Sequence, residues 1–255
     1  MKAASQIKTR QVSVMLLKNK KILIVGGTSG FGKQVALQSL ALGAKVSIIG
    51  RSKNKLKYFV NEQKSKSYAL QGTVLDASEQ DQLTAFFSKN NFYDHIISTL
   101  GGAMGGGFLD SQLADIRKAI EDKFFVNLQL AQAAVPFINA GGSITFTSGT
   151  GGHPSNASGA IVGNQAINTL VKGLALEMKS ERKRANAVAP TWSPTGLWRN
   201  LTNEQLVQRE KEVAAQTPLG RTAHINEVAS AYVYLMSNDF ITGQVLNVDG
   251  GVSAS

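Results

Sequence analysis

Three glycines, Gly26, Gly30 and Gly32, follow an apolar run at positions 22–25 and precede a helical pattern. Glycines at this spacing let the backbone turn sharply after a strand and approach a phosphate without interference from a Cβ atom. The N-terminus of the following helix contributes free N–H groups and a partial positive charge. The pattern therefore predicts a site for a nucleotide pyrophosphate, the alternative being glycines that only make a turn.

The elements around this loop form a repeating pattern. Positions 33–42 place apolar residues at helical spacings, Gly43 ends that helix, and 45–49 is expected to be a second strand. Further strands are expected at 68–70, 94–98, 142–147, 184–189 and 244–248, with amphipathic helical stretches between them. This alternation predicts one α/β domain, a parallel sheet of about seven strands with helices on both faces.

Composition narrows the class of protein. The chain has no cysteine, which excludes disulfides and thiol nucleophiles, and its histidines (His95, His153, His224) are too scattered for a metal cluster. No apolar run approaches the ~18 residues that span a bilayer. With no recognisable signal peptide, a cytoplasmic location is expected.

The basic charge is concentrated near the N-terminus. The net charge is +10, but six of the 27 basic residues lie in the first 21 positions, which contain no acid. Residues 1–14 are expected to be a flexible extension, dispensable for folding, before a domain at 15–255. No nucleic-acid-binding motif accompanies the charge, so neither nucleic acid nor membrane is an expected partner.

The end of the second expected strand bears on the choice of cofactor. It reads Ile49-Gly50-Arg51-Ser52-Lys53, so the carboxylate that binds the adenosine ribose of NAD and repels a 2′-phosphate is missing. Arg51 is able to pair with a phosphate through two hydrogen bonds, and Ser52 adds a hydroxyl donor. The segment favours NADP(H), the alternative being a solvated charged turn.

Short motifs follow one another in order at 25–32, 75–78, 98–101, 126–128, 148, 186–190 and 248–251. From Lys20 to Gly251 they resemble the short-chain dehydrogenase/reductase family, which implies a doubly wound Rossmann fold, oxidoreductase activity on a small-molecule substrate, and a homodimer or homotetramer built on the helices around 114–135 and 156–178. The resemblance also implies a set of cofactor-binding residues: Gly26, Thr28, Ser29, Gly30, Phe31, Gly32, Asp76, Ala77, Thr99, Leu100, Gly101, Pro190 and Thr195.

The catalytic motif of the family is incomplete. Ser148 and Asn127 match the family's catalytic serine and asparagine, but the positions of its tyrosine and lysine fall on Ala160 and Asn164. A register shifted by one residue gives Ile161 and Gln165 instead. No tyrosine lies between Ser148 and Glu177, so a reductase of this type needs another proton donor.

Two other side chains are candidates for that proton transfer. Lys123 lies one helical turn before Asn127, and His153 lies in the loop after Ser148 and can titrate near neutral pH. The alternatives are a solvated or subunit-facing lysine and an ordinary loop histidine. Trp192, Leu197 and Trp198 suggest an apolar pocket, covered by a lid with a helix near 203–214.

Three functions therefore remain open. The first is an NADP(H)-dependent oxidoreductase that interconverts a carbonyl and an alcohol by an atypical proton path through Ser148, Asn127, Lys123 or His153. The second is an NADP(H)-binding protein without redox turnover, a sensor or a structural partner. The third is a lyase or isomerase that abstracts a proton in the same cleft.

Overall fold

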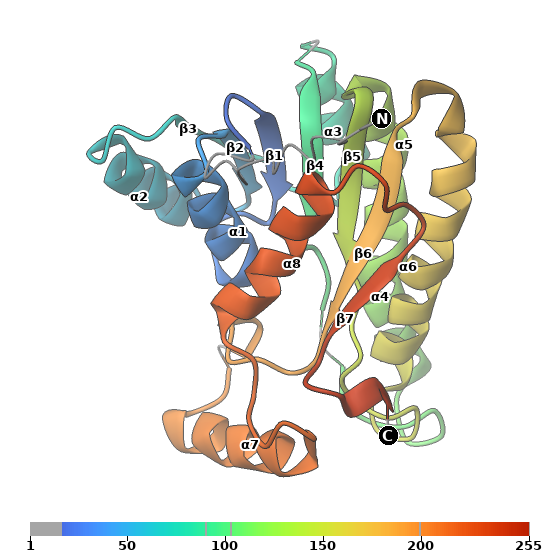
Figure 1. The fold of residues 1–255 in the computed structure, drawn as a ribbon. Coiled ribbons are helices and arrows are strands. Elements are labelled where there is room, and N and C mark those ends of the chain that lie inside the picture. Colours follow the sequence, from blue (N-terminus) through green and yellow to red (C-terminus); the bar gives the residue numbers. More distant parts are fainter. Residues whose placement is uncertain (1–16, 90, 103, 199, 255) are drawn as a thin grey trace, which may run out of the picture.

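A computed structural model describes residues 17–254 apart from 90, 103 and 199. Its central sheet has seven parallel strands in the order β3-β2-β1-β4-β5-β6-β7 (Figure 1). The strands are β1 (Lys21–Val25), β2 (Lys45–Gly50), β3 (Leu70–Val74), β4 (Tyr93–Ser98), β5 (Ile138–Thr147), β6 (Arg184–Pro190) and β7 (Val245–Val248). The predicted doubly wound parallel sheet is confirmed. The predicted extension at residues 1–14 lies outside the described residues.

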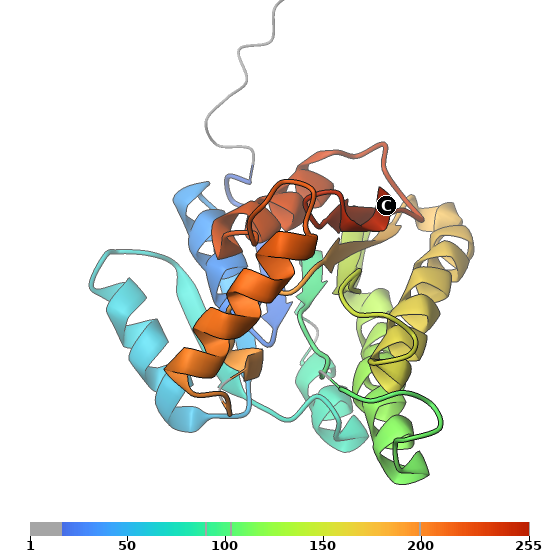
Figure 2. The ribbon, with the colours of Figure 1, turned by 90° about the horizontal axis from the view of Figure 1, so that it is seen from below.

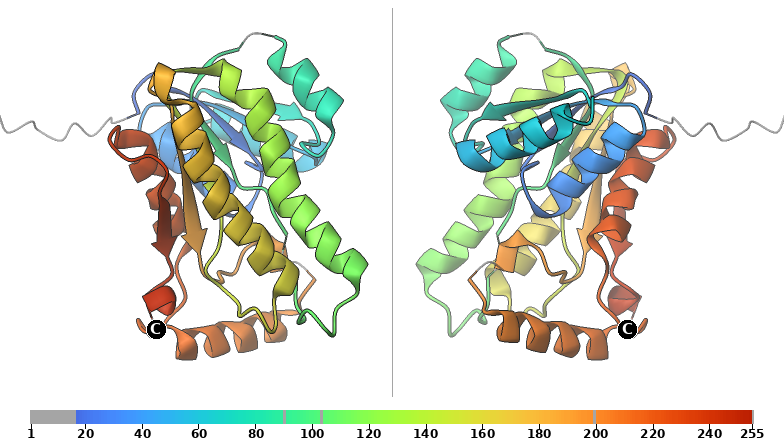
Figure 3. Two further views of the ribbon diagram at one scale, coloured as in Figure 1. Left: turned by 90° about the vertical axis from the view of Figure 1, so that its right-hand side faces the viewer. Right: turned by 90° about the vertical axis from the view of Figure 1, so that its left-hand side faces the viewer.

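Helices connect the strands and cover both faces of the sheet (Figures 1 and 3). The longer helices are α1 (Gly30–Ala41), α2 (Lys53–Lys64), α3 (Gln80–Phe87), α4 (Leu113–Ile120), α5 (Val126–Ala134), α6 (Ser158–Glu177), α7 (Asn203–Gln216) and α8 (Ile225–Ser237). A π-helical turn, η1 (Glu121–Phe125), joins α4 to α5, and short 3₁₀ turns lie at η2 (Val135–Phe137), η3 (Lys179–Glu181), η4 (Gly196–Trp198) and η5 (Val252–Ala254). Among the described helices, none combines the length and the apolar character needed to cross a membrane.

The buried strand β1 explains the two-sided core. Its residues Ile22 to Val25 are fully buried, as expected for a central strand covered on both faces. Leu23 and Val25 pack with α3, α5 and α6, whereas Ile22 and Ile24 pack with α1, α2 and α8. Side chains alternate across a strand, so one apolar run supplies both cores.

Element boundaries depart from the expected ones where the apolar pattern is weak. The third strand is Leu70–Val74, not 68–70, because it is an edge strand with largely exposed residues whose position is set by pairing with β2. The first helix begins at Gly30 rather than at 33. Gly43 follows it with φ +84°, in agreement with its predicted role as the residue that ends the helix. The expected helix near 203–214 is α7.

Candidate functional site

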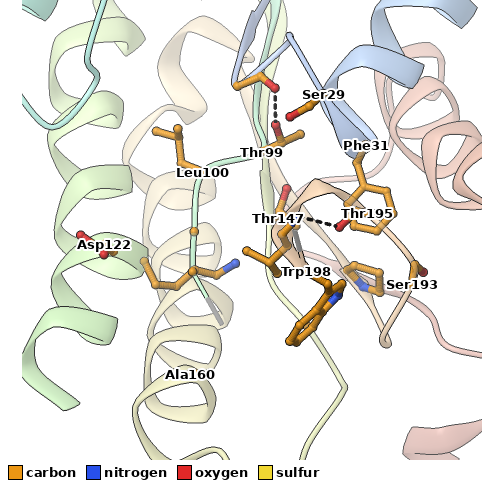
Figure 4. A pocket seen from close by; sticks show the side chains of 18 of the residues that line it. Ser29, Phe31, Thr99, Leu100, Asp122, Thr147, Ala160, Ser193, Thr195 and Trp198 are labelled. Atoms are coloured by element: carbon orange, nitrogen blue, oxygen red, sulfur yellow. Dashed lines mark hydrogen bonds between the residues drawn. The ribbon is translucent and has the colours of Figure 1, made fainter. Parts of the chain in front are cut away.

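A cavity of ≈ 1270 Å³ opens at the carboxyl ends of the strands, where α7 crosses beneath the sheet (Figures 1 and 2). It runs from the glycine loop to Lys123, Ser148 and Trp198. Figure 4 shows Ser29, Phe31 and Thr99 near the glycine loop, and Asp122 and Ala160 on helices opposite Ser193 and Trp198. Every residue predicted to bind the cofactor lines this cavity except Gly32.

The glycine loop is shaped by close backbone contacts. Gly26 has φ +87°, and a Cβ there would lie 2.6 Å from Oγ1 of Thr99. A Cβ on Gly32 would lie 2.5 Å from the carbonyl oxygen of Gly26, so Gly32 allows the start of α1 to pack against the loop rather than lining the cavity. The Thr99 hydroxyl donates to the carbonyl oxygen of Val25 at 3.2 Å and thereby ties the end of β4 to the loop.

Thr195 lies opposite the glycine loop, next to Gly30. A Cβ on Gly30, which has φ +51°, would lie 3.5 Å from the Cβ of Thr195. The segment after β6 therefore lies close to the glycine loop, and both line the same cavity. A bulky side chain at position 30 would obstruct this cavity.

The end of β2 carries a basic side chain beside a carboxylate. A Cβ on Gly50 would lie 2.6 Å from Cγ2 of Thr28, so this position has no room for an acid. Arg51 is 74% exposed and its Nη1 lies 3.8 Å from Oδ2 of Asp76. Partial burial opposes ionisation of Asp76, but hydrogen bonds from Ser78 and the charge of Arg51 outweigh it and hold the pKa of the Asp76 carboxyl below its ordinary value.

Lys123 lies at the other end of the cavity, in the π-helical turn η1. Its side chain is buried, with 6% exposure, and Nζ donates a long hydrogen bond of 3.4 Å to the carbonyl oxygen of Ser148. Burial lowers the pKa of the Lys123 amine to about 8. Among the described residues, no carboxylate lies within ion-pair distance of this amine.

Asn127 is fully buried and does not line the cavity. Its amide Nδ2 donates to the carbonyl oxygen of Lys123 at 2.6 Å, and its Oδ1 accepts from the hydroxyl of Ser98 at 2.5 Å. Asn127 therefore links the π-helical turn to the end of β4. This contact orients the turn that carries Lys123.

Ser148 lines the cavity with its proton directed toward α6. Its hydroxyl lies 2.6 Å from Oδ1 of Asn168 and 3.1 Å from the carbonyl oxygen of Asn164, which are both acceptors. The serine proton is therefore held by the protein, and its oxygen is left as an acceptor. Asn168 was missed by sequence reasoning, although it lies one helical turn after Asn164 on the same helix.

The two registers that the sequence allows for the family's tyrosine and lysine differ in position. Ala160 and Asn164 line the cavity, whereas Ile161 and Gln165 do not. None of the five tyrosines lines the described cavity. Tyr232 makes a hydrogen bond of 2.7 Å with Thr147, which lines the cavity, but complete burial raises the pKa of its phenol well above the ordinary value.

His153 lies away from the cavity lining. It is exposed, and its Nδ1 lies 2.8 Å from Oγ of Ser155 in the same loop. The structure therefore does not bring His153 together with Lys123 and Ser148. The glycines before it, Gly151 and Gly152, line the cavity in its place.

The segment after β6 and helix α7 contribute both aromatic and polar groups to the cavity lining. Trp192 and Trp198 line the cavity with ring centroids 6.0 Å apart. The face of α7 toward the cavity is polar, and the sequence analysis did not predict this. The polar residues on this face recur at helical spacing: Glu204, Gln205, Gln208, Arg209 and Glu212. Within the described part of the chain, no cluster of three or more potential metal ligands occurs among histidine, aspartate and glutamate side chains.

Comparisons with known proteins agree with this geometry. A family model described as "enoyl-(acyl carrier protein) reductase" matches residues 25–253. A tropinone reductase homolog of Arabidopsis thaliana is 32% identical over 253 residues, covering 94% of each chain. A short-chain type dehydrogenase/reductase from Mycobacterium ulcerans superposes with a TM-score of 0.82 at 26% identity, over 93% of this chain and 91% of the other.

A more distant solved structure shares the fold. It is a gluconate 5-dehydrogenase from Burkholderia cenocepacia J2315 in complex with NADP and tartrate, with a TM-score of 0.84 at 22% identity. The alignment covers 94% of this chain and 98% of that chain. Matches over almost the whole length agree with one continuous α/β fold.

Proposed function

Because this chain belongs to the short-chain dehydrogenase/reductase family, we propose that it is an NADP(H)-dependent oxidoreductase that interconverts a carbonyl and an alcohol on a small molecule. One observation carries the proposal: a single cavity joins the glycine loop and Arg51 at one end to Lys123 and Ser148 at the other. Such a cavity suits a long cofactor whose reactive end meets a substrate beneath a lid.

The residues present fit a dinucleotide. The positive φ values of Gly26 and Gly30 and the tight packing at Gly32 leave the loop free of side chains where a pyrophosphate would approach. Thr28, Ser29, Gly30 and Phe31 would hold the phosphates, Asp76 and Ala77 the adenine, and Thr99, Leu100, Gly101, Pro190 and Thr195 the nicotinamide half. A bound nicotinamide cofactor supplies the reducing equivalent.

The preference for NADP(H) is supported by charge. Gly50 leaves no carboxylate to repel a 2′-phosphate, and the exposed guanidinium of Arg51 is held near the cavity by Asp76. Ser52 lines the same end, and its hydroxyl also caps α2 by accepting from the N–H of Lys55 at 3.4 Å. The NADP complex of the gluconate 5-dehydrogenase is a precedent within this fold.

The proposed proton path uses Lys123 at the cavity, with Ser148 beside it as a hydrogen-bond acceptor and Asn127 behind it as the residue that orients the turn. Ala160 and Asn164 supply neither a phenol nor an amine where the family's tyrosine and lysine are expected. His153 has no place in this path because it does not reach the cavity lining. The expected homodimer or homotetramer stays a prediction.

The cofactor assignment is tested by Arg51→Ala. We expect its affinity for NADPH to fall about tenfold or more while its affinity for NADH changes little, because only NADPH of the two cofactors carries the 2′-phosphate with which the arginine would pair. Fluorescence titration of both cofactors measures this. Lys53→Ala is the matched control, because Lys53 is exposed and does not line the cavity. Equal binding of both cofactors by the wild type would overturn the assignment.

The activity is tested with carbonyl substrates. Wild-type protein, NADPH and a panel of ketones and aldehydes, with tropinone among them, are followed by the absorbance of the reduced cofactor and by identification of the alcohol. We expect at least one alcohol product. Tight NADPH binding without any reduction would favour the alternative of a cofactor-binding protein without turnover.

A further inference from the structure

The π-helical turn η1 places an amine in space that glycines keep open. A Cβ on Gly163 would lie 2.8 Å from Cβ and 2.9 Å from Cγ of Lys123, and a Cβ on Gly101 would lie 2.9 Å from both its Cδ and Nζ. The lysine stem therefore passes between α6 and the loop after β4. A larger residue at either position would displace it from the cavity.

The turn that carries Lys123 is specifically held. An extra residue per turn is rare in helices and is found mostly at functional sites. Here it is supported by the hydrogen bond from Asn127 to the carbonyl oxygen of Lys123, which is backed in turn by Ser98. Both supporting side chains are fully buried, so the direction of the lysine is set by the interior of the protein.

The amine also has unused hydrogen-bonding capacity. One of its three N–H groups donates the long hydrogen bond to the carbonyl oxygen of Ser148. Among the described residues, Nζ makes no other hydrogen bond. The nearby carboxylate of Asp122 is paired with Lys118 at 2.8 Å instead. The amine therefore has donors free to face a ligand.

The other polar groups near Lys123 in the cavity cannot release a proton to a substrate. The hydroxyl of Ser148 is directed to acceptors on α6, and the hydroxyl of Thr147 lies 2.8 Å from the carbonyl oxygen of Ser98, to which it donates. Asn164 lines the cavity, but an amide is not an acid near neutral pH. Asp122 and Lys118 also line the cavity but are paired with each other, so among the described residues Lys123 is the buried titratable group there without an ion-pair partner.

We propose that Lys123 is the general acid that protonates the substrate's carbonyl oxygen, an assignment that rests on the proposed reductase function. A bound reduced nicotinamide cofactor would supply a hydride to the carbonyl carbon, and the electron pair of the carbon–oxygen π bond would move to oxygen. The ammonium of Lys123 gives that oxygen a proton, so the products are the alcohol, the oxidised cofactor and a neutral amine. Solvent returns the proton to the amine.

The first test measures how the reactivity of the Lys123 amine depends on pH, and it needs neither cofactor nor turnover. The full-length protein is labelled with a trace of an acylating reagent across a range of pH, and the labelled lysines are quantified by mass spectrometry. We expect the reactivity of Lys123 to rise with a midpoint near 8, well below the roughly 10.4 of ordinary lysines. A midpoint for Lys123 equal to that of the ordinary lysines would overturn the proposal. So would the absence of any labelling of Lys123 across the pH range.

The second test compares Lys123→Met with Lys172→Met, an exposed lysine on α6 outside the cavity lining. We expect Lys123→Met to reduce kcat by about 10²- to 10⁴-fold with NADPH affinity retained, and Lys172→Met to keep the wild-type rate. The wild-type kcat for reduction should fall as pH rises through the pKa of Lys123, because the neutral amine has lost the proton.

The outcomes separate the two proposals. A wild-type enzyme that reduces carbonyls while Lys123→Met keeps its rate overturns the role of Lys123 alone. A wild-type protein that binds NADPH but reduces no carbonyl overturns the proposed function, and the assigned acid role with it.

Discussion

At the scale of single residues, the proposed proton path replaces one kind of acid by another. A phenol needs a neighbouring positive charge to titrate near neutral pH, whereas a buried amine reaches that range through desolvation alone. Lys123 has that environment, since burial lowers its pKa to about 8 and, within the part of the chain that the structure describes, no carboxylate pairs with the amine. Lys123 lies on the π-helical turn and not on α6. In the proposed path, Ala160 and Asn164 on α6 therefore need not supply the proton.

A tyrosine and a lysine introduced on α6 test the expected position of the family's catalytic pair. In a Lys123→Met background, Ala160→Tyr with Asn164→Lys is expected to raise the rate of reduction at least about tenfold above that of Lys123→Met alone. The reason is that a lysine beside the phenol favours its ionised form and restores a proton donor. The rate of NADPH oxidation with a reducible ketone measures it. Ile161→Tyr with Gln165→Lys is the control, since those residues do not line the cavity. Equal recovery by both pairs would contradict this register.

At the scale of elements, α6 is shaped by the lysine that passes it. The helix has a glycine at position 163, where a Cβ would collide with the stem of Lys123, and another at 173, where the nearest atom is Oε1 of Glu177 at 3.8 Å. Glycine inside a helix costs about 0.5–1 kcal/mol relative to alanine. Gly163 therefore lowers the stability of the helix and makes room for the amine, whereas Gly173 has no such steric reason.

Two substitutions on α6 separate these effects. Gly173→Ala is expected to raise the free energy of unfolding by about 0.5–1 kcal/mol through helix propensity. Gly163→Ala is expected to lower it by roughly 1–3 kcal/mol, because the added methyl group overpacks the contact with Lys123. Urea unfolding of both variants makes the comparison. Stabilisation by Gly163→Ala would mean that Lys123 does not occupy this gap.

At the scale of the whole molecule, a buried histidine couples folding to pH. His95 lies in β4 with 5% exposure, and its Nδ1 lies 2.8 Å from Oγ of Ser143 on the neighbouring strand β5. Burial, aided by the charge of Arg184, lowers the pKa of His95 to about 4 against the opposing effect of Asp94. The unfolded chain therefore binds a proton at a higher pH than the folded chain does.

This difference predicts a loss of stability in mild acid. The contribution of neutral His95 is complete above about pH 6.5 and is lost as the pH falls toward 4, at up to roughly 1.4 kcal/mol per pH unit. Urea unfolding at pH 7, 6 and 5 measures it, with His95→Gln as the variant that lacks the titration. A wild-type slope no steeper than that of His95→Gln would exclude His95 as the cause.

The sequence by itself determined the local and periodic features. The glycine loop, the end of α1 at Gly43 and most strands were predictable because turn chemistry and the apolar period are properties of neighbouring residues. Most of the predicted cofactor residues came instead from the resemblance to a known family, and they lie at strand ends that meet at one edge of the parallel sheet. Lys123 could be named as a candidate from its spacing to Asn127, but its environment could not.

Only the tertiary structure decided which candidates meet. The strand Leu70–Val74 is placed by pairing with β2, because its own residues are too polar to mark it. Local hydrogen bonds in its loop keep His153 out of the cavity lining, and acceptors on α6 engage the proton of Ser148. Lys123 is buried because Gly101 and Gly163, distant in the chain, leave space on both sides of it. Burial and orientation arise from contacts between remote segments, and these depend on how the helices pack on the sheet.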